Sequence, residues 1–514
     1  MTTGGSGRRT FPRPPPRRLP PESADASPPA APPGSLDRRR IEAPPGFNRW
    51  LVPPAIHLCI GEVYAFSVFK LPLTRLLGVS ESAPGDWTQP DVAWVFSIAI
   101  AFLGLSAAAF GSWLERVGPR AAMFASAACF GGGFLVSAAG VWLHQLWLLY
   151  LGYGVLGGVG LGLGYISPVS TLIKWFPDRP GMATGLAIMG FGGGAMIGSP
   201  LSQTLMDHFG SAASAGVAET FATLGVVYFA FMLFGAWTVR LPPAGWVPPG
   251  AIRSPPTAGA TPNEAVRTRS FWLLWAVLLL NVTAGIGVLE QASPMIQEMF
   301  PGRVSAGAAA GFVGLLSLFN MAGRIVWSSA SDRIGRKPTY LIFFALGAVL
   351  YAAIPLTGEA GNLLLFVAGY AVVMSMYGGG FATIPAYLRD QFGLRQVGAI
   401  HGRLLTAWSL AGVAGPVLVN QIRQAQIDGG VRPADAYTMT MELMAVLLVV
   451  GFACNLLVRR AASATPASVA VAPVGLQRPG ETHWPTLAFR WAWVGLPLAW
   501  GVSQTIRKSL PLFG

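Results

Sequence analysis

A short charged segment occurs twice in the chain, each time directly after a long apolar stretch. The first copy contains Glu115 and Gly118, and the second contains Asp332 and Gly335. The two carboxylates are 217 positions apart, and so are the two glycines. A repeat of this length predicts two related halves of several helices each, rather than a solenoid of short repeats.

The stretches between the charged segments are apolar and long. Of the 514 residues, 53% are hydrophobic and only 11% are charged, which is not the composition of a soluble globular protein. Each stretch provides the roughly 20 residues with which a helix crosses a ~30 Å hydrocarbon core. We therefore predict an all-α membrane protein of two six-helix halves related by a pseudo-two-fold axis. The predicted spans are 50–72, 91–112, 120–143, 146–173, 181–206 and 219–240, then 271–295, 305–328, 338–356, 362–387, 397–420 and 437–458.

The segments outside these spans have a different composition. Residues 1–46 are rich in Pro and Arg and contain few large apolar side chains, so we predict a disordered tail. A polar, Pro-rich linker, 241–269, separates the first half, 47–240, from the second half, 270–460. The C-terminal segment, 461–514, is predicted to be a linker followed by one further helix.

That further helix comes from an apolar run at residues 484–504. Two interpretations stay open: a thirteenth membrane span, or a helix lying on the membrane surface. A thirteenth span would place Arg507 and Lys508 outside, against the charge rule for membrane proteins.

The net charge of +13 indicates a membrane orientation better than it indicates nucleic-acid binding. Lys and Arg collect in the tail, the linker and alternate loops, whereas the opposite loops are poorer in them. In membrane proteins, the loops on the cytoplasmic side carry an excess of Lys and Arg over the loops on the opposite side. The tail and the linker are therefore predicted to be cytoplasmic, and no nucleic-acid partner is expected.

Motifs for catalysis, cofactors or metals are missing from the sequence. Cys59, Cys129 and Cys454 all lie in apolar spans, so no disulfide framework or metal spacing follows. The glycines of the fourth and fifth spans lack the Gly-Lys-Ser/Thr of a phosphate loop. We expect no enzyme and no cofactor, because no nucleophile–base pair is present either.

Four further segments carry a family resemblance. They are 61–69 (GEVYAFSVF), 164–168 (GYISP), 174–179 (KWFPDR) and 320–324 (NMAGR). Together with the paired charged loops, they resemble the oxalate/formate antiporter family of the major facilitator superfamily. The resemblance implies a secondary transporter that alternates between inward-open and outward-open states. It further implies a small organic anion as substrate, a bacterial inner membrane as location and a functional monomer.

Arg324 is the predicted centre of the substrate site. It lies eight residues before Asp332, which places it about 12 Å inside the helix end. An arginine at that depth is costly unless it faces a partner or a cavity, and its guanidinium can hold a carboxylate by two hydrogen bonds. The resemblance agrees, because oxalate-transporting members use an arginine on this helix. The alternative is an internal ion pair with Glu62 or Glu290.

Trp408 lies where the oxalate carrier of this family places a lysine, near the middle of the eleventh span. One central cation matches a monoanion better than a dianion, so we predict a monocarboxylate and not oxalate. Tyr64, Tyr153 and Tyr377 lie on other spans that face the cavity in this fold, and with Trp408 they are predicted to line it. Ordinary packing is the alternative for each of these aromatic residues.

Glu62, Glu290 and His401 are candidates for proton coupling or for ion pairing. Proton symport therefore stays open beside antiport, which we favour. Export of an unrelated compound and a sensor without transport activity are further alternatives.

The charged loops themselves have a predicted mechanical role. Asp332 can accept hydrogen bonds from a facing helix end when the cytoplasmic side is closed. The residues assigned to these loops are Glu115, Arg116, Gly118, Arg120, Asp332, Arg333, Gly335, Arg336 and Lys337.

Overall fold

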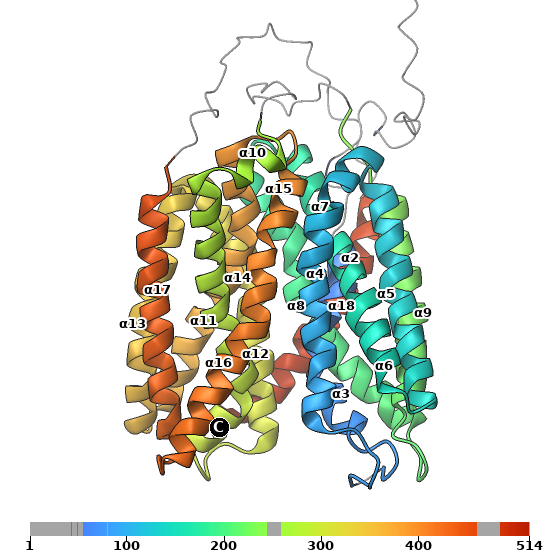
Figure 1. Ribbon diagram of the computed structural model, residues 1–514, viewed down its shortest axis with the longest axis vertical. Helices are drawn as coiled ribbons and strands as arrows, with labels where there is room; N and C mark the ends of the chain where they lie inside the picture. The colour runs from blue at the N-terminus through green and yellow to red at the C-terminus, as the bar shows by residue number, and fades with distance from the viewer. Residues whose placement is uncertain are drawn as a thin grey trace, which may run out of the picture. The chain divides into compact units, whose positions relative to one another are not determined.

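The computed structural model describes residues 43, 49, 55–79, 81–243, 259–459 and 484–512, except for the side chains of Ala55, Val288, Glu290 and Ala306. Nearly all of the predicted tail and about half of the predicted linker lie outside the described residues, as does the segment between the last two helices. The described part is helical throughout its regular structure (Figure 1).

The first half contains the helices of six predicted spans. The first span is divided into three pieces, and the fourth contains a π-helical segment. The elements are α2 (Ala55–Ile60), η2 (Gly61–Ala65), α3 (Ser67–Leu73), α4 (Gln89–Val117), α5 (Pro119–Trp142), α6 (Leu146–Leu149), η3 (Tyr150–Gly157), α7 (Gly158–Trp175), α8 (Pro180–Phe209) and α9 (Val217–Thr238).

The second half repeats this order, with its eleventh span interrupted at Leu405. The elements are α10 (Pro262–Val266), α11 (Arg269–Met299), α12 (Ala306–Ile334), α13 (Arg336–Glu359), α14 (Leu363–Phe392), α15 (Val397–Leu404), α16 (Thr406–Asp428), η4 (Asp435–Tyr437), α17 (Thr438–Leu457), α18 (Trp484–Ser509) and η6 (Leu510–Leu512).

The described helices confirm the predicted fold class. Eleven of them are long and apolar enough to cross a membrane, or twelve if the pieces of the first span, bent by 48°, count as one. Several helices continue beyond the predicted spans, as α4 and α12 do to include Glu115 and Asp332. Hydropathy marks only the part of a helix that lipid surrounds, whereas the hydrogen-bonded backbone continues into the polar region.

Close backbone contacts explain the many glycines. A Cβ at Gly61 would lie 2.5 Å from the carbonyl oxygen of Phe191, and one at Gly160 would lie 2.6 Å from the backbone nitrogen of Phe130. Only glycine permits such an approach, which is how membrane helices pack without large side chains between them.

The two halves meet along two seams related by the repeat. In one seam α8 packs against α12, and in the other α4 packs against α15 and α16. Ser409 of α16 donates to the carbonyl of Ile100 at 2.6 Å and accepts from the backbone of Gly104 at 3.0 Å. These contacts hold residues of α4 directly against the second half.

α18 lies along the flank of the bundle and contacts both halves. Its first turns stack Trp493 on Phe234 of α9 at 4.7 Å, Gly501 lies against α8, and the backbone of Lys508 passes Gly311 of α12. Phe234 is near one end of the bundle and Gly311 near the other, so α18 runs the length of the bundle. It is not among the helices that are apolar enough to cross a membrane, and the two interpretations of this segment, a thirteenth span or a helix on the membrane surface, both stay open.

Candidate functional site

Arg324 is buried between the two halves, and one nitrogen of its guanidinium has no hydrogen-bond partner in the described part of the chain. Its side chain is 0% exposed; Nε donates to Asn320 Oδ1 at 3.0 Å and Nη1 donates to the carbonyl of Ile188 at 3.3 Å. Nη2 makes no hydrogen bond within the described residues, and no ion pair there involves this arginine. Asn320 lies one turn away on the same helix, so the guanidinium is held in place while one donor remains unused.

Two aromatic rings lie beside this guanidinium and two more pack against those rings, and we call the four rings the aromatic box. The guanidinium carbon lies 5.7 Å from the ring of Phe191 on α8 and 5.4 Å from the ring of Phe381 on α14. Trp408 contacts these two rings at 5.6 and 4.9 Å. Tyr165 of α7 completes the box, 6.0 Å from Trp408. Ring faces stabilise a cation at such distances without neutralising it.

Further polar atoms of the box also lack partners. The hydroxyl of Tyr165 and Nε1 of Trp408 are buried without a hydrogen bond in the described part of the chain. His401 of α15, whose ring lies 5.7 Å from that of Tyr165, has two such nitrogens. Buried polar groups are nearly always paired, so a cluster of unpaired donors beside a cation fits an anionic ligand with several acceptor oxygens.

Two tyrosines bridge the halves beside the box. The hydroxyls of Tyr64 on η2 and Tyr377 on α14 are 3.4 Å apart, and Tyr64 packs edge-on against Phe191 at 5.1 Å. α14 ends at the charged loops, and Tyr377 lies one turn farther from that end than Phe381 does. The pair therefore covers the box on the side away from the charged loops, and we call it the tyrosine lid.

On the side of the charged loops, hydrogen bonds of Asp332 connect α12 to α8. Its carboxylate accepts hydrogen bonds from the backbone nitrogens of Gly181 and Met182, each at 2.8 Å, in the first turn of α8. Arg336 donates to the same carboxylate and to Asp390, the latter at 3.1 Å. A carboxylate at a helix N-terminus satisfies free N–H groups and complements the helix dipole. The structure thus places Asp332 in its predicted position, with the charged-loop end closed.

Glu115 occupies the equivalent place in the first half with different partners. A Cβ at Gly398, in the first turn of α15, would lie 2.8 Å from Glu115, as one at Gly181 would from Asp332. Yet Glu115 pairs with Lys174 at 2.8 Å and accepts from Ser170 at 3.3 Å, both within its own half. The repeat therefore preserves the position but not the bond between halves.

The remaining residues of the charged loops have local roles. Gly118 and Gly335 have φ angles of +86° and +91°, which explains the glycine in each copy. Arg120 donates to the carbonyl of Trp237 at 2.9 Å, and Lys337 donates to the carbonyls of Leu456 and Val458. Arg116 and Arg333 are exposed at the same end of the bundle.

One predicted lining residue lies elsewhere. Tyr153 of η3 packs against Phe66, Phe134 and Phe221 at 4.7, 5.3 and 6.4 Å, inside the first half. The sequence identified its helix correctly, but the direction of a side chain around a helix axis is set by packing. We leave Tyr153 out of the site.

Glu62 is not the ion-pair partner of Arg324 in this structure. Its carboxylate accepts hydrogen bonds from Tyr228 at 2.9 Å and from Ser202 at 3.2 Å, both in the first half. Glu290 lies on α11, and its side chain is outside the described part.

Phe191, Phe381 and Tyr165 were not predicted as lining residues, although one signal in the sequence pointed to Phe191. Phe191 lies 217 positions before Trp408, so the repeat itself relates two walls of the box. Gly192 follows, and a Cβ there would lie 2.7 Å from Nε of Arg324. Any larger residue at position 192 would collide with the side chain of Arg324.

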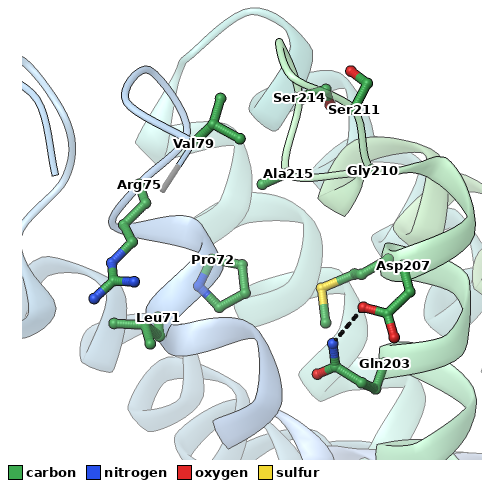
Figure 2. Close-up of a pocket in the computed structure, with 11 residues that line it drawn as sticks. Leu71, Pro72, Arg75, Val79, Gln203, Asp207, Gly210, Ser211, Ser214 and Ala215 are labelled. Carbon is green, nitrogen blue, oxygen red and sulfur yellow. Dashed lines mark hydrogen bonds between the residues drawn. The ribbon is translucent and has the colours of Figure 1, made fainter. Parts of the chain in front are cut away.

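One cavity in the described part of the chain lies away from the aromatic box. It has a volume of about 480 Å³ and lies at the end of the bundle opposite the charged loops (Figure 2). Leu71, Pro72 and Arg75 form one wall, and the other includes Gln203, whose Nε2 donates to Asp207 at 2.8 Å. The cavity belongs to the first half, whereas the box lies between the halves.

Comparison with known proteins agrees with this architecture. The family model described as Major Facilitator Superfamily matches residues 46–416. The oxalate:formate antiporter of Oxalobacter formigenes is 26% identical over 72% of this chain and 83% of its own. Apicoplast pyruvate carrier 1 of Toxoplasma gondii is 25% identical over 78% of this chain and 86% of its own.

A solved structure shows the same fold at lower identity. The fucose:proton symporter FucP of E. coli superposes with a TM-score of 0.58 at 13% identity, covering 80% of this chain and 98% of its own. At that identity the similarity concerns the arrangement of the helices alone.

Proposed function

The chain belongs to the Major Facilitator Superfamily, and on that premise we propose that it carries a small organic anion with a single carboxylate across a membrane by exchange. The carboxylate binds the guanidinium of Arg324 inside the aromatic box. The substrate is a monocarboxylate of the size of formate, lactate or pyruvate.

The unused nitrogen of Arg324 is the observation that carries this proposal. A fully buried guanidinium with a free donor and no described anion nearby has lost its hydration without an equivalent replacement. A carboxylate supplies the missing charge and accepts from the free donor, while Trp408 and Tyr165 offer further donors.

We propose a monoanion because, among the described residues, the aromatic box contains one cation, Arg324, and not two. Trp408 stands where the family resemblance expects a second cation, and its ring packs directly on the box. Two named relatives, an oxalate:formate antiporter and a pyruvate carrier, support a small carboxylate as the substrate class. The uncharged remainder of the substrate then contacts the aromatic walls.

Transport requires the box to open alternately on its two sides. In the proposed cycle, the bonds of Asp332 close the charged-loop end, and the tyrosine lid closes the other side. Breaking the Asp332 bonds would separate α12 from α8 and open the box toward the charged loops. By the charge rule, we place those loops in the cytoplasm.

The test is exchange in proteoliposomes. Purified protein is reconstituted with internal unlabelled anion, and uptake of labelled formate, lactate, pyruvate and oxalate is measured. We expect internal monocarboxylate to stimulate uptake of at least one external monocarboxylate, with oxalate a poor substrate. Absence of exchange with all four would overturn the proposal, and preference for oxalate would overturn the charge argument.

A further inference from the structure

Glu62 forms a second buried ionisable site, away from the aromatic box. Its side chain is 1% exposed, and its two described hydrogen bonds come from hydroxyl groups, those of Tyr228 and Ser202. Among the described residues no ion pair involves it. A lone carboxylate anion is unfavourable in such surroundings, whereas the protonated acid can both donate and accept there.

The surroundings are shaped around this carboxyl group. A Cβ at Gly198 of α8 would lie 1.5 Å from Glu62 Oε2, so the carboxyl group fills the space of the absent side chain. The titratable groups that face it are Cys59 of its own span, Tyr153 of η3 and Tyr228 of α9. All three are neutral in their ordinary forms at pH 7, and none supplies a compensating positive charge.

The element that carries Glu62 also carries part of the lid. η2 is a single turn of five residues in which Glu62 faces the first half and Tyr64 bonds to Tyr377 of the second half. This turn continues α2, and the first span bends by 48° directly after it, where α3 begins. A change in the hydrogen bonds of Glu62 therefore displaces the backbone that positions the tyrosine lid.

The cavity in Figure 2 comes within one helical turn of a residue that bonds to Glu62. Met206 lines this cavity and lies one turn along α8 from Ser202, which donates to Glu62. Gln203 and Asp207 line the wall beside it (Figure 2). Water in this cavity of about 480 Å³ would bring protons to this side of α8.

We propose that Glu62 binds and releases the coupling proton of this carrier, so that the protein performs proton-driven net uptake as well as exchange. This inference rests on the proposed function. One proton passes from water to the Glu62 carboxylate while one monocarboxylate binds Arg324, and both are released on the other side. The loaded step is electroneutral, and the empty carrier returns to its starting side only after Glu62 has lost its proton.

The experiment separates exchange from net uptake. Exchange needs only the loaded, protonated carrier to reorient, whereas net uptake also needs the empty carrier to release its proton. Glu62→Gln mimics the protonated acid, so we expect exchange within about twofold of wild type. Proton-gradient-driven uptake, and the accompanying acidification reported by a dye inside the vesicles, should fall at least tenfold.

Glu219→Gln is the matched control. Glu219 lies on α9 and accepts from Trp142 Nε1 at 3.1 Å, a bond that glutamine keeps, so both activities should stay at wild-type levels. Full gradient-driven uptake by Glu62→Gln, or exchange in the wild type without any gradient-driven uptake, would overturn the proton site. Absence of exchange in the wild type would instead overturn the proposed function.

If Glu62→Gln does not fold, a second variant tests whether Glu62 is the proton site. Tyr228→Phe keeps the carboxyl group and removes one of its hydrogen bonds. It should displace the pH of half-maximal net uptake while leaving exchange intact, whereas a purely structural role predicts an unchanged pH profile.

Discussion

The two halves of the molecule bury opposite charges in different ways. In the first half, Glu62 receives two hydrogen bonds from its own half. In the second half, Arg324 faces the first half across the seam and keeps one nitrogen unpaired. A group satisfied inside one half moves with that half, whereas a group left unpaired between the halves is available to a ligand.

The charged loops repeat this difference. Asp332 bonds to the backbone of the other half, but Glu115 bonds to Lys174 and Ser170 of its own half. The second half therefore supplies both the proposed anion site and the stronger closing contact. The repeat preserved the positions while the bonding partners diverged.

Removing the unpaired charge should have the largest effect. Arg324→Gln eliminates the cation that the proposed carboxylate binds. Loss of one partner of a buried charge pair costs about 2–5 kcal/mol, or roughly 30- to 5,000-fold in affinity. Exchange at low substrate concentration should fall accordingly, with normal yield and elution on gel filtration. Exchange within threefold of wild type would remove Arg324 from the site.

Weakening the bond between the halves should have the next largest effect. Asp332→Asn leaves one acceptor oxygen for two backbone donors and removes its charge-assisted bond to Arg336. Such bonds contribute about 1.5–3 kcal/mol each, so the closed end loses stability. We expect the maximal exchange rate to fall about tenfold with substrate affinity nearly unchanged. An affinity loss equal to the rate loss would contradict a purely mechanical role.

Adding a second cation should change specificity. Trp408→Lys places an ammonium group beside the aromatic box, where two cations suit a dianion. We expect measurable oxalate exchange and weaker monocarboxylate exchange by this variant. Trp408→Leu serves as the control for lost packing and should gain no oxalate activity. If the lysine variant inserts correctly and gains none either, Trp408 does not lie where the substrate charge binds.

Neutralising the counterpart of Asp332 should have the smallest effect. Glu115→Gln disrupts a partly exposed pair with Lys174 inside one half. Such pairs contribute about 0–1 kcal/mol, so we expect a change in exchange rate below about threefold. A loss as large as that of Asp332→Asn would show that the two loops are equivalent.

The sequence predicted the helices and the burial of Arg324, but not the directions of all side chains. Twelve spans, two halves and the depth of Arg324 followed from hydropathy and the repeat. Tyr153 and Phe191 lie on helices of the same half, yet only Phe191 reaches the guanidinium. Rotation about a helix axis depends on packing between helices, and breaks such as η2 and η3 alter it further.

The most direct test measures what Arg324 recognises. Binding of pyruvate and of its neutral amide is compared by calorimetry for the wild type and for Arg324→Gln. If the guanidinium binds the carboxylate, the wild type should prefer pyruvate by at least tenfold, and the variant should lose that preference. An equal preference for pyruvate in both proteins would contradict the account.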